Sequence, residues 1–229
     1  MIQLNDFDWG ARSIEPSEAD AFAAQVDVSA LDRERIRKIL QEFPVTCQVR
    51  GMFFQGLVDT IARARSYEAA KALVKAGGVR TRFVPFSLMP HRDFYKLYFL
   101  ASALMFPGYK LEHGFERIAE DFYPTFRSSM VGRTISAFIG SEPIAVLERL
   151  AQAYRVSIPW NEHAVEADGA RRARWRCKVE PSDLYPATFR GIIRGTMNSH
   201  GVSEPTVELL DSQRDGEGIR FEFSIEWSN

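Results

Sequence analysis

The sequence has few cysteines and none of the common short motifs of catalytic or metal sites. Only Cys47 and Cys177 occur in 229 residues, far apart and without metal-like spacing. No GxSxG, HExxH or P-loop motif is present, and no Asp/Glu, His and Ser stand out in the order of a catalytic triad. We therefore predict a protein that is not an enzyme, without catalytic or metal-binding residues, in a reducing cytoplasm.

The sequence also lacks an excess of either charge and a long hydrophobic run. It has 29 basic and 30 acidic residues, a formal net charge of -1, which favours neither nucleic acid nor an anionic membrane as partner. The longest apolar stretch, Leu97 to Phe106, is well short of the roughly 20 residues of a membrane span. The N-terminus, MIQLNDFDWG, does not resemble a signal peptide. We expect a soluble cytoplasmic protein with no membrane span and no nucleic-acid partner.

Aromatic residues, by contrast, are abundant. The chain contains 17 Phe, 7 Tyr and 4 Trp. Such rings bury large areas and often line cavities as well as filling a core. Their number favours a binding site for an apolar molecule.

The first 157 residues follow mainly a helical period. We divide the chain into an N-terminal arm, residues 1–44, and an α+β domain resembling ligand-binding domains, residues 45–229. The arm contains a short helix at Glu18–Gln25 and a second helix that Ser29 caps, up to Phe43. Then come a strand-like run, Val45–Arg50, an extended segment, Phe83–Met89, and helices at Met52–Ile61, Tyr67–Ala76 before Gly77-Gly78, Phe94–Met105, Leu111–Phe138 and Pro143–Tyr154. Pro124 should kink or split the long helix at Tyr123.

From Trp160 the period changes to two residues, which indicates a sheet. Two alternating runs flank Asp168–Ala170, and a three-residue loop there would pair His163 with Trp175. A helix with Ala187, Gly191 and Gly195 allows close approach of a neighbour, and two more strands follow, ending at Trp227. The fold class is therefore α+β: a helical N-terminal half packed on a C-terminal antiparallel sheet of ββαββ order.

One strand of this sheet carries a row of basic residues. Arg172, Arg174, Arg176 and Lys178 could follow the phosphates of a nucleic acid. The same face carries Glu166, Glu222 and Glu226, so we favour a solvated ladder of ion pairs.

Three segments resemble the myxobacterial paralogous family of unknown function. They are VRGMFFQGL at 49–57, LYFLASALMFPGYKLEHGFERIAEDFYPTFRSSMVGRT at 97–134 and PIAVLERLAQAYRVS at 143–157, and the resemblance extends over residues 45–227. That family is distantly similar to haem-nitric-oxide-binding domains and to four-vinyl-reductase-type domains that hold small hydrophobic molecules. The resemblance implies a helical half with a C-terminal sheet and a binding role, without naming a ligand.

Haem is the first ligand to weigh, because the haem-binding relatives use an axial His and a Tyr-x-Ser-x-Arg clamp on the sheet. Here Tyr123-Pro-Thr-Phe-Arg127 has Thr in place of Ser and falls in a helical region. We interpret the four histidines, His91, His113, His163 and His200, as surface or capping residues. We therefore predict no cofactor, with haem as a possibility that the missing clamp argues against.

A pocket for a small hydrophobic molecule is the second hypothesis, with an ordinary filled core as its alternative. The candidate lining residues are rings and aliphatic side chains on facing helices, and Arg133 could anchor a carboxylate or tie a helix to the sheet. We predict a non-enzymatic sensory or regulatory module with a possible protein partner and a homodimer left open. The rival functions are a structural or protein-interaction scaffold and a haem-based gas sensor. The predicted site residues are Phe53, Phe94, Leu97, Tyr98, Phe122, Phe126 and Arg133.

Overall fold

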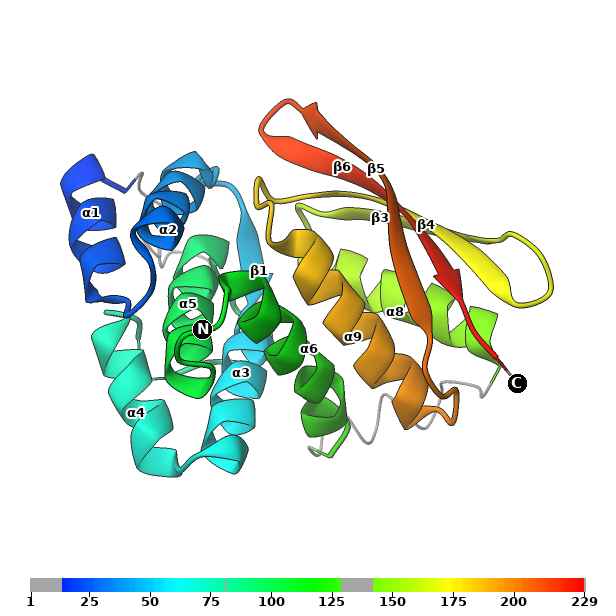
Figure 1. Ribbon diagram of the computed structural model, residues 1–229, viewed down its shortest axis with the longest axis horizontal. Helices are drawn as coiled ribbons and strands as arrows, with labels where there is room; N and C mark the ends of the chain where they lie inside the picture. Colours follow the sequence, from blue (N-terminus) through cyan, green and yellow to red (C-terminus); the bar gives the residue numbers. More distant parts are fainter. Residues whose placement is uncertain (1–13, 81, 129–141, 229) are drawn as a thin grey trace, which may run out of the picture.

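A helical N-terminal half lies beside a C-terminal antiparallel sheet, as the sequence predicts (Figure 1). The computed structural model describes residues 14–80, 82–128 and 142–228. Helices α1 and α4 lie at the end of the molecule furthest from the sheet, whereas α8 and α9 lie against one sheet face (Figure 1). The fold class is therefore α+β.

The N-terminal half contains seven helices among its described residues and one short two-stranded sheet. Ser29 accepts a hydrogen bond from the amide of Asp32 and begins the second helix, and Gly78, with φ +62°, follows the end of the fourth. The elements are α1 (Pro16–Gln25), α2 (Ala30–Glu42), β1 (Gln48–Arg50), α3 (Gly51–Ala64), α4 (Tyr67–Ala76), β2 (Leu88–Pro90), α5 (His91–Met105), α6 (Leu111–Ser128) and α8 (Pro143–Ser157).

Helix α6 runs unbroken through Pro124 to Ser128, so the predicted split at Tyr123 is wrong. Proline at 124 cannot donate a hydrogen bond to the carbonyl of Glu120. That carbonyl oxygen lies against Gly195 of the later helix α9, and the residues next to the proline, Tyr123 and Thr125, are buried. Packing therefore holds the helix across the missing bond. The predicted continuation through Phe138 lies outside the described residues.

The C-terminal half has the predicted ββαββ order. Its elements are β3 (Glu162–Ala167), β4 (Arg172–Val179), α9 (Tyr185–Ser199), β5 (Thr206–Asp215) and β6 (Gly218–Glu226), and the sheet order is β3-β4-β6-β5. Trp175 and Phe223 point from the sheet toward α9, where their ring centres lie 5.0 Å and 4.3 Å from that of Phe189. The alternation of the strands buries this face and leaves the other to solvent.

The hairpin between β3 and β4 has a longer loop than predicted. His163 pairs with Cys177 and Val165 with Trp175, so residues 168–171 form the connection and the predicted His163–Trp175 pair is wrong. Asp168 accounts for the difference, because it forms ion pairs of 3.1 Å with both Arg172 and Arg174 across the loop. The shift is two residues, which preserves the period-two pattern and the assignment of each side chain to its face.

The basic row on β4 forms the predicted ladder of ion pairs. Arg174 contacts Glu222 at 2.7 Å, and Arg176 contacts Glu166 at 2.9 Å. The Arg176–Glu166 pair is solvent-exposed and contributes little stability, and the Arg174–Glu222 pair is half-buried. The row is therefore neutralised within the sheet.

Helices α6 and α9 pack closely against each other. A Cβ atom at Gly191 would overlap the carbonyl oxygen of Glu116 and lie 2.7 Å from the Cβ of Ala119. A Cβ atom at Gly195 would overlap the carbonyl oxygen of Glu120. Both glycines are therefore needed for the close approach that the sequence predicts.

We expect Gly191→Ala to lower the free energy of unfolding by about 1–3 kcal/mol, because the methyl group must push α6 and α9 apart. Urea denaturation of the purified variant measures this change. Asn198→Ala, at an exposed position of the same helix, is the matched control. Equal denaturation midpoints for the two variants would show that the glycine is not required.

His163 is buried in the sheet, so its interpretation as a surface residue is wrong. It is 4% exposed, its Nδ1 accepts a hydrogen bond of 3.2 Å from the indole Nε1 of Trp175, and its ring stacks on Tyr154. Burial, with a further effect of the charge on Arg155, lowers its pKa to about 3. The folded protein therefore keeps this ring neutral well below the usual pKa of histidine.

This burial makes stability depend on pH. The unfolded chain binds a proton at His163 near its ordinary pKa of 6.5, whereas the folded chain does so only near 3. The free energy of unfolding should therefore fall as pH decreases from 6.5 toward 3, by up to about 1.4 kcal/mol per pH unit from this group. Urea denaturation at several pH values between about 6.5 and 5, where few carboxylates titrate, tests the slope. His163→Gln should reduce the dependence of the free energy of unfolding on pH. His113→Gln, at an exposed position, is the control and should leave this dependence unchanged. Equal slopes in wild type and His163→Gln would contradict the prediction.

Candidate functional site

An open apolar groove of about 550 Å³ lies where α3 and α6 meet α8 and α9. Its volume falls in the range of about 300–1,000 Å³ that is common for small-molecule sites. Phe86 and Val156 are 64% and 58% exposed, so an apolar occupant would remove considerable surface from water. The main apolar lining residues are Met52, Phe86, Phe126, Val146, Leu150 and Val156.

Two smaller cavities continue the groove toward the core. The first, of about 100 Å³, shares Met52, Phe126 and Leu150 with the groove. The second, of about 40 Å³, shares Phe53 and Tyr154 with the first and has room for little more than one water molecule. The three spaces thus follow one another from the surface to the interior between the two halves of the protein.

The first turn of α3 and a second apolar stripe on α8 build the walls of this groove. In α3, Phe54 and Leu57 fill the core, whereas Met52 and Phe53 face the groove and the cavities. In α8, Leu147 and Ala151 belong to the buried core. A second set, spaced by three or four residues, faces the groove: Val146, Leu150, Ala153 and Val156. The helical spacing of these four residues is visible in the sequence, but a prediction based on aromatic rings does not include them.

The structure brings most of the predicted site residues to these spaces. Phe126 lines the groove, and Phe53 lines both smaller cavities. The predicted residues Phe94, Tyr98 and Phe122 line the innermost cavity. The ring centre of Phe53 lies 5.5 Å from that of Phe122 and 6.1 Å from that of Phe94.

Two predicted residues are not part of this lining. Leu97 is fully buried, and its Cδ2 atom lies beside Gly77 at the end of α4. It therefore fills the core between helices. Arg133 lies outside the described residues.

A buried polar cluster lies at the inner end of the path. The carboxylate of Glu180, just beyond β4, accepts hydrogen bonds of 2.8 Å from the hydroxyl of Tyr95 and 3.1 Å from the amide of Asn161. His91 places its Nδ1 atom 3.9 Å from the same carboxylate. A buried carboxylate requires such partners, since its desolvation is otherwise costly. The cluster thus ties α5 of the helical half to the end of β4.

His91 is 2% exposed, so its interpretation as a surface residue is also wrong. Burial lowers its pKa, and the charge of Glu180 partly opposes this shift. The thiol of Cys47 lies 3.5 Å from the same Nδ1 atom that faces Glu180, and burial raises the pKa of this thiol. In a thiol nucleophile activated by histidine, the thiol contacts one ring nitrogen and the carboxylate contacts the other. The thiol must also lose its proton readily, which requires a low pKa. This trio lacks both properties.

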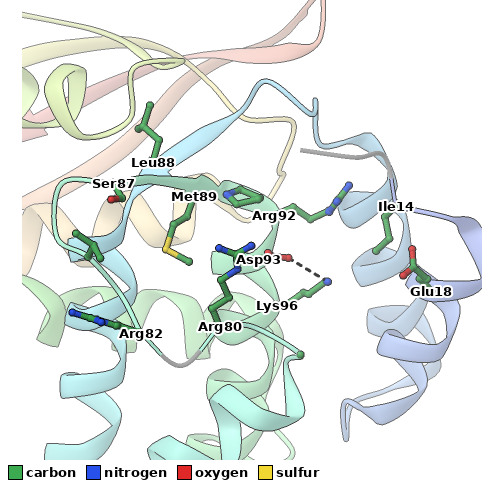
Figure 2. A pocket seen from close by; sticks show the side chains of 13 residues that line it. Ile14, Glu18, Arg80, Arg82, Ser87, Leu88, Met89, Arg92, Asp93 and Lys96 are labelled. Atoms are coloured by element: carbon green, nitrogen blue, oxygen red, sulfur yellow. Dashed lines mark ion pairs between the residues drawn. The ribbon is translucent and has the colours of Figure 1, made fainter. Parts of the chain in front are cut away.

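A second hollow, of about 310 Å³, lies between α1, α5 and the segment before β2 and has a different character (Figure 2). Arg80, Arg92 and Lys96 line it, but Asp93 lies among them and forms an ion pair of 3.3 Å with Lys96. Figure 2 shows the Arg80 and Lys96 side chains on either side of Asp93. Its charges are therefore partly neutralised within the protein, and the apolar groove is the stronger candidate.

Two general features narrow the chemistry of the described residues. Within residues 14–80, 82–128 and 142–228, no group of three His, Cys, Asp or Glu side chains is arranged to hold a metal ion. In the same part of the chain, no helix is both long and apolar enough to cross a membrane.

Solved structures with a similar fold are H-NOX domains. A single-residue variant of Tt H-NOX has a TM-score of 0.65 at 13% identity, over 79% of this chain and 95% of that one. An oxygen-binding H-NOX domain related to soluble guanylate cyclases has a TM-score of 0.61 at 12% identity, over 79% of this chain and 95% of that one. A variant of T. tengcongensis H-NOX has a TM-score of 0.54 at 15% identity, over 79% and 98%. At such identities the likeness concerns the fold alone.

Comparison with curated proteins finds no significant match. A family model does match residues 45–228, the greater part of the chain and nearly the range over which the sequence resembles a paralogous family. That model is described as "Protein of unknown function (DUF2378)". The chain therefore belongs to the DUF2378 family and has an H-NOX-like fold.

Proposed function

We propose that this protein is a sensory or regulatory module, without catalytic activity, that binds a small hydrophobic molecule in the groove between its two halves. The observation that carries the proposal is the continuous apolar path from the groove of about 550 Å³ to the aromatic cavity beside Phe53. The H-NOX domains with a similar fold support a sensory role, since one of them is described as oxygen-binding. The arrangement of Cys47, His91 and Glu180, which does not suit nucleophilic catalysis, supports the absence of an enzymatic role.

The position of the groove supplies a mechanism for signalling. Its walls come from α3 and α6 on one side and from α8 and α9 on the other, so an occupant contacts all four helices. A ligand that prefers one packing of these helices shifts the population of two states. The N-terminal residues 1–44 transmit that shift to a protein partner. Within them, Arg35 of α2 forms ion pairs with Glu112 of α6 and with Asp183, which lies just before α9. A shift of these helices therefore reaches α2.

The described residues do not fit haem, the cofactor that the fold suggests. An axial His, Cys or Tyr, or a Met together with a His, must face a cavity wide enough for the porphyrin. No histidine of the described part lines the wide groove, and His91 lines only the cavity of about 40 Å³. Tyr123, which lines the groove, has its hydroxyl 2.8 Å from Nε2 of His200, and Arg127 donates to the carbonyl of Ser199. These groups are already engaged, so the proposal involves no haem.

Filling the groove should abolish binding of an apolar probe. Ala153 lines both the groove and the first cavity and is exposed, so Ala153→Trp places an indole in the path without disturbing the core. Titration with the neutral fluorophore N-phenyl-1-naphthylamine should show saturable binding to the wild type and at least about tenfold weaker binding to this variant, since the indole replaces the probe's contacts.

Glu148→Trp is the matched control, because Glu148 is exposed on the same helix and does not line the groove. It should bind the probe like the wild type. Native mass spectrometry of the protein as purified, with an absorption spectrum, tests for a co-purified ligand. A bare polypeptide that binds no probe would favour a scaffold with a filled core, and a Soret band would indicate haem.

A further inference from the structure

We infer that the ligand of the groove is a free, single-chain amphiphile with an anionic head, such as a long-chain carboxylate. The carboxylate binds the guanidinium of Arg50 at the rim, and the chain runs inward toward Phe53. This inference rests on the proposed function and adds a charge requirement to it. It is carried by two arginines, Arg50 and Arg149, that line an otherwise mainly apolar groove.

Arg50 is held in place by the backbone. Its Nε donates to the carbonyl of Val156 at 2.8 Å, and its Nη1 donates to the carbonyl of Phe86 at 2.6 Å. Val156 and Phe86 are themselves groove residues, so these bonds fix the guanidinium between two exposed apolar walls. Of the five N–H groups of an arginine, three remain for a carboxylate, and the fixed position reduces the entropy lost on binding.

The positive charge of the rim is not neutralised by nearby acidic residues. No Asp or Glu lines the groove, and neither Arg50 nor Arg149 forms an ion pair among the described residues. On the sheet, by contrast, Arg174 and Arg176 have carboxylate partners. An anion at the rim therefore supplies charge that the protein does not.

The rest of the groove suits a hydrocarbon chain. Beyond the rim the path is lined by Met52, Phe126 and Leu150, then by Phe53 and Ile192. The volume decreases from about 550 Å³ in the groove to about 100 Å³ in the first cavity. A linear chain fits such a path better than a broad ring system. Each buried methylene group contributes to binding through the hydrophobic effect. Head and chain are thus recognised by different parts of one site.

The test compares dodecanoate with dodecanol, which has the same chain without the charge, by competition with N-phenyl-1-naphthylamine below the micellar concentration. Wild type should bind dodecanoate more tightly. In Arg50→Gln the ratio of the two affinities should fall about tenfold, since charge-assisted hydrogen bonds to the head are lost. The ratio is measured within one sample, so partial loss of folded protein affects both ligands equally.

Arg149→Gln is a second variant that keeps the Arg50 contacts, because Arg149 is exposed and hydrogen-bonds only to Gln152 among the described residues. Its ratio should fall about threefold, since an exposed charge is largely screened by solvent. Arg33→Gln, at an exposed position outside the groove, is the control and should leave the ratio unchanged.

The outcomes separate this inference from the proposed function. If both ligands bind equally and neither arginine variant changes the ratio, the anionic head is excluded while the apolar site stands. If neither ligand binds, the proposed function fails. Binding of butyrate as tight as that of dodecanoate would overturn the role of the chain. If the protein sediments with phosphatidylglycerol vesicles in a way that depends on Arg50, and dodecanoate shows no saturable binding, the inference of a free amphiphile is overturned. The site then binds a membrane surface.

Discussion

The contact between α6 and α9 is the constraint on which the arrangement of the two halves depends. Helix α6 belongs to the helical half, and α9 lies on the buried face of the sheet. Gly191 and Gly195 let the helices meet at backbone distance, against the carbonyl oxygens of Glu116 and Glu120. At that distance a single methyl group must displace one helix. The contact fixes α6 relative to the sheet, and thereby one wall of the groove relative to the other.

The groove follows from this arrangement because α8 cannot fill the space beside α6. One stripe of α8, with Leu147 and Ala151, packs into the core. Its second apolar stripe continues to Ala153 and Val156, which are exposed on the wall of the groove. Arg50 and Arg149 also line this groove. An apolar path with a cationic entrance is therefore a consequence of helix packing and does not require a catalytic or metal-binding motif.

The polar groups of the interior have a connecting role. Glu180 binds side chains from α5 and from the segment before β3, so one buried carboxylate ties the helical half to the sheet. His163 binds Trp175 across the β3–β4 hairpin. The two buried histidines, His91 and His163, have lowered pKa values and lie close to the surface shared by the two halves. Their protonation would oppose the folded arrangement, which links the integrity of the site to pH.

The sequence by itself determined the order and type of the elements, because hydrophobic periodicity and capping residues act over a few neighbours. The switch at Trp160, the cap at Ser29 and the role of Gly191 and Gly195 in close packing could all be read there. Phe53, Phe122 and Phe126 could be proposed as lining residues because the helical period places them on the apolar faces of their helices. Only the tertiary structure decided that Pro124 leaves α6 intact, that His91 and His163 are buried, and that Leu97 fills the core. It also brought Arg50 to the groove, since its carbonyl partners at Phe86 and Val156 are 36 and 106 residues away. Such contacts depend on the packing of distant segments, which no local pattern in the sequence encodes.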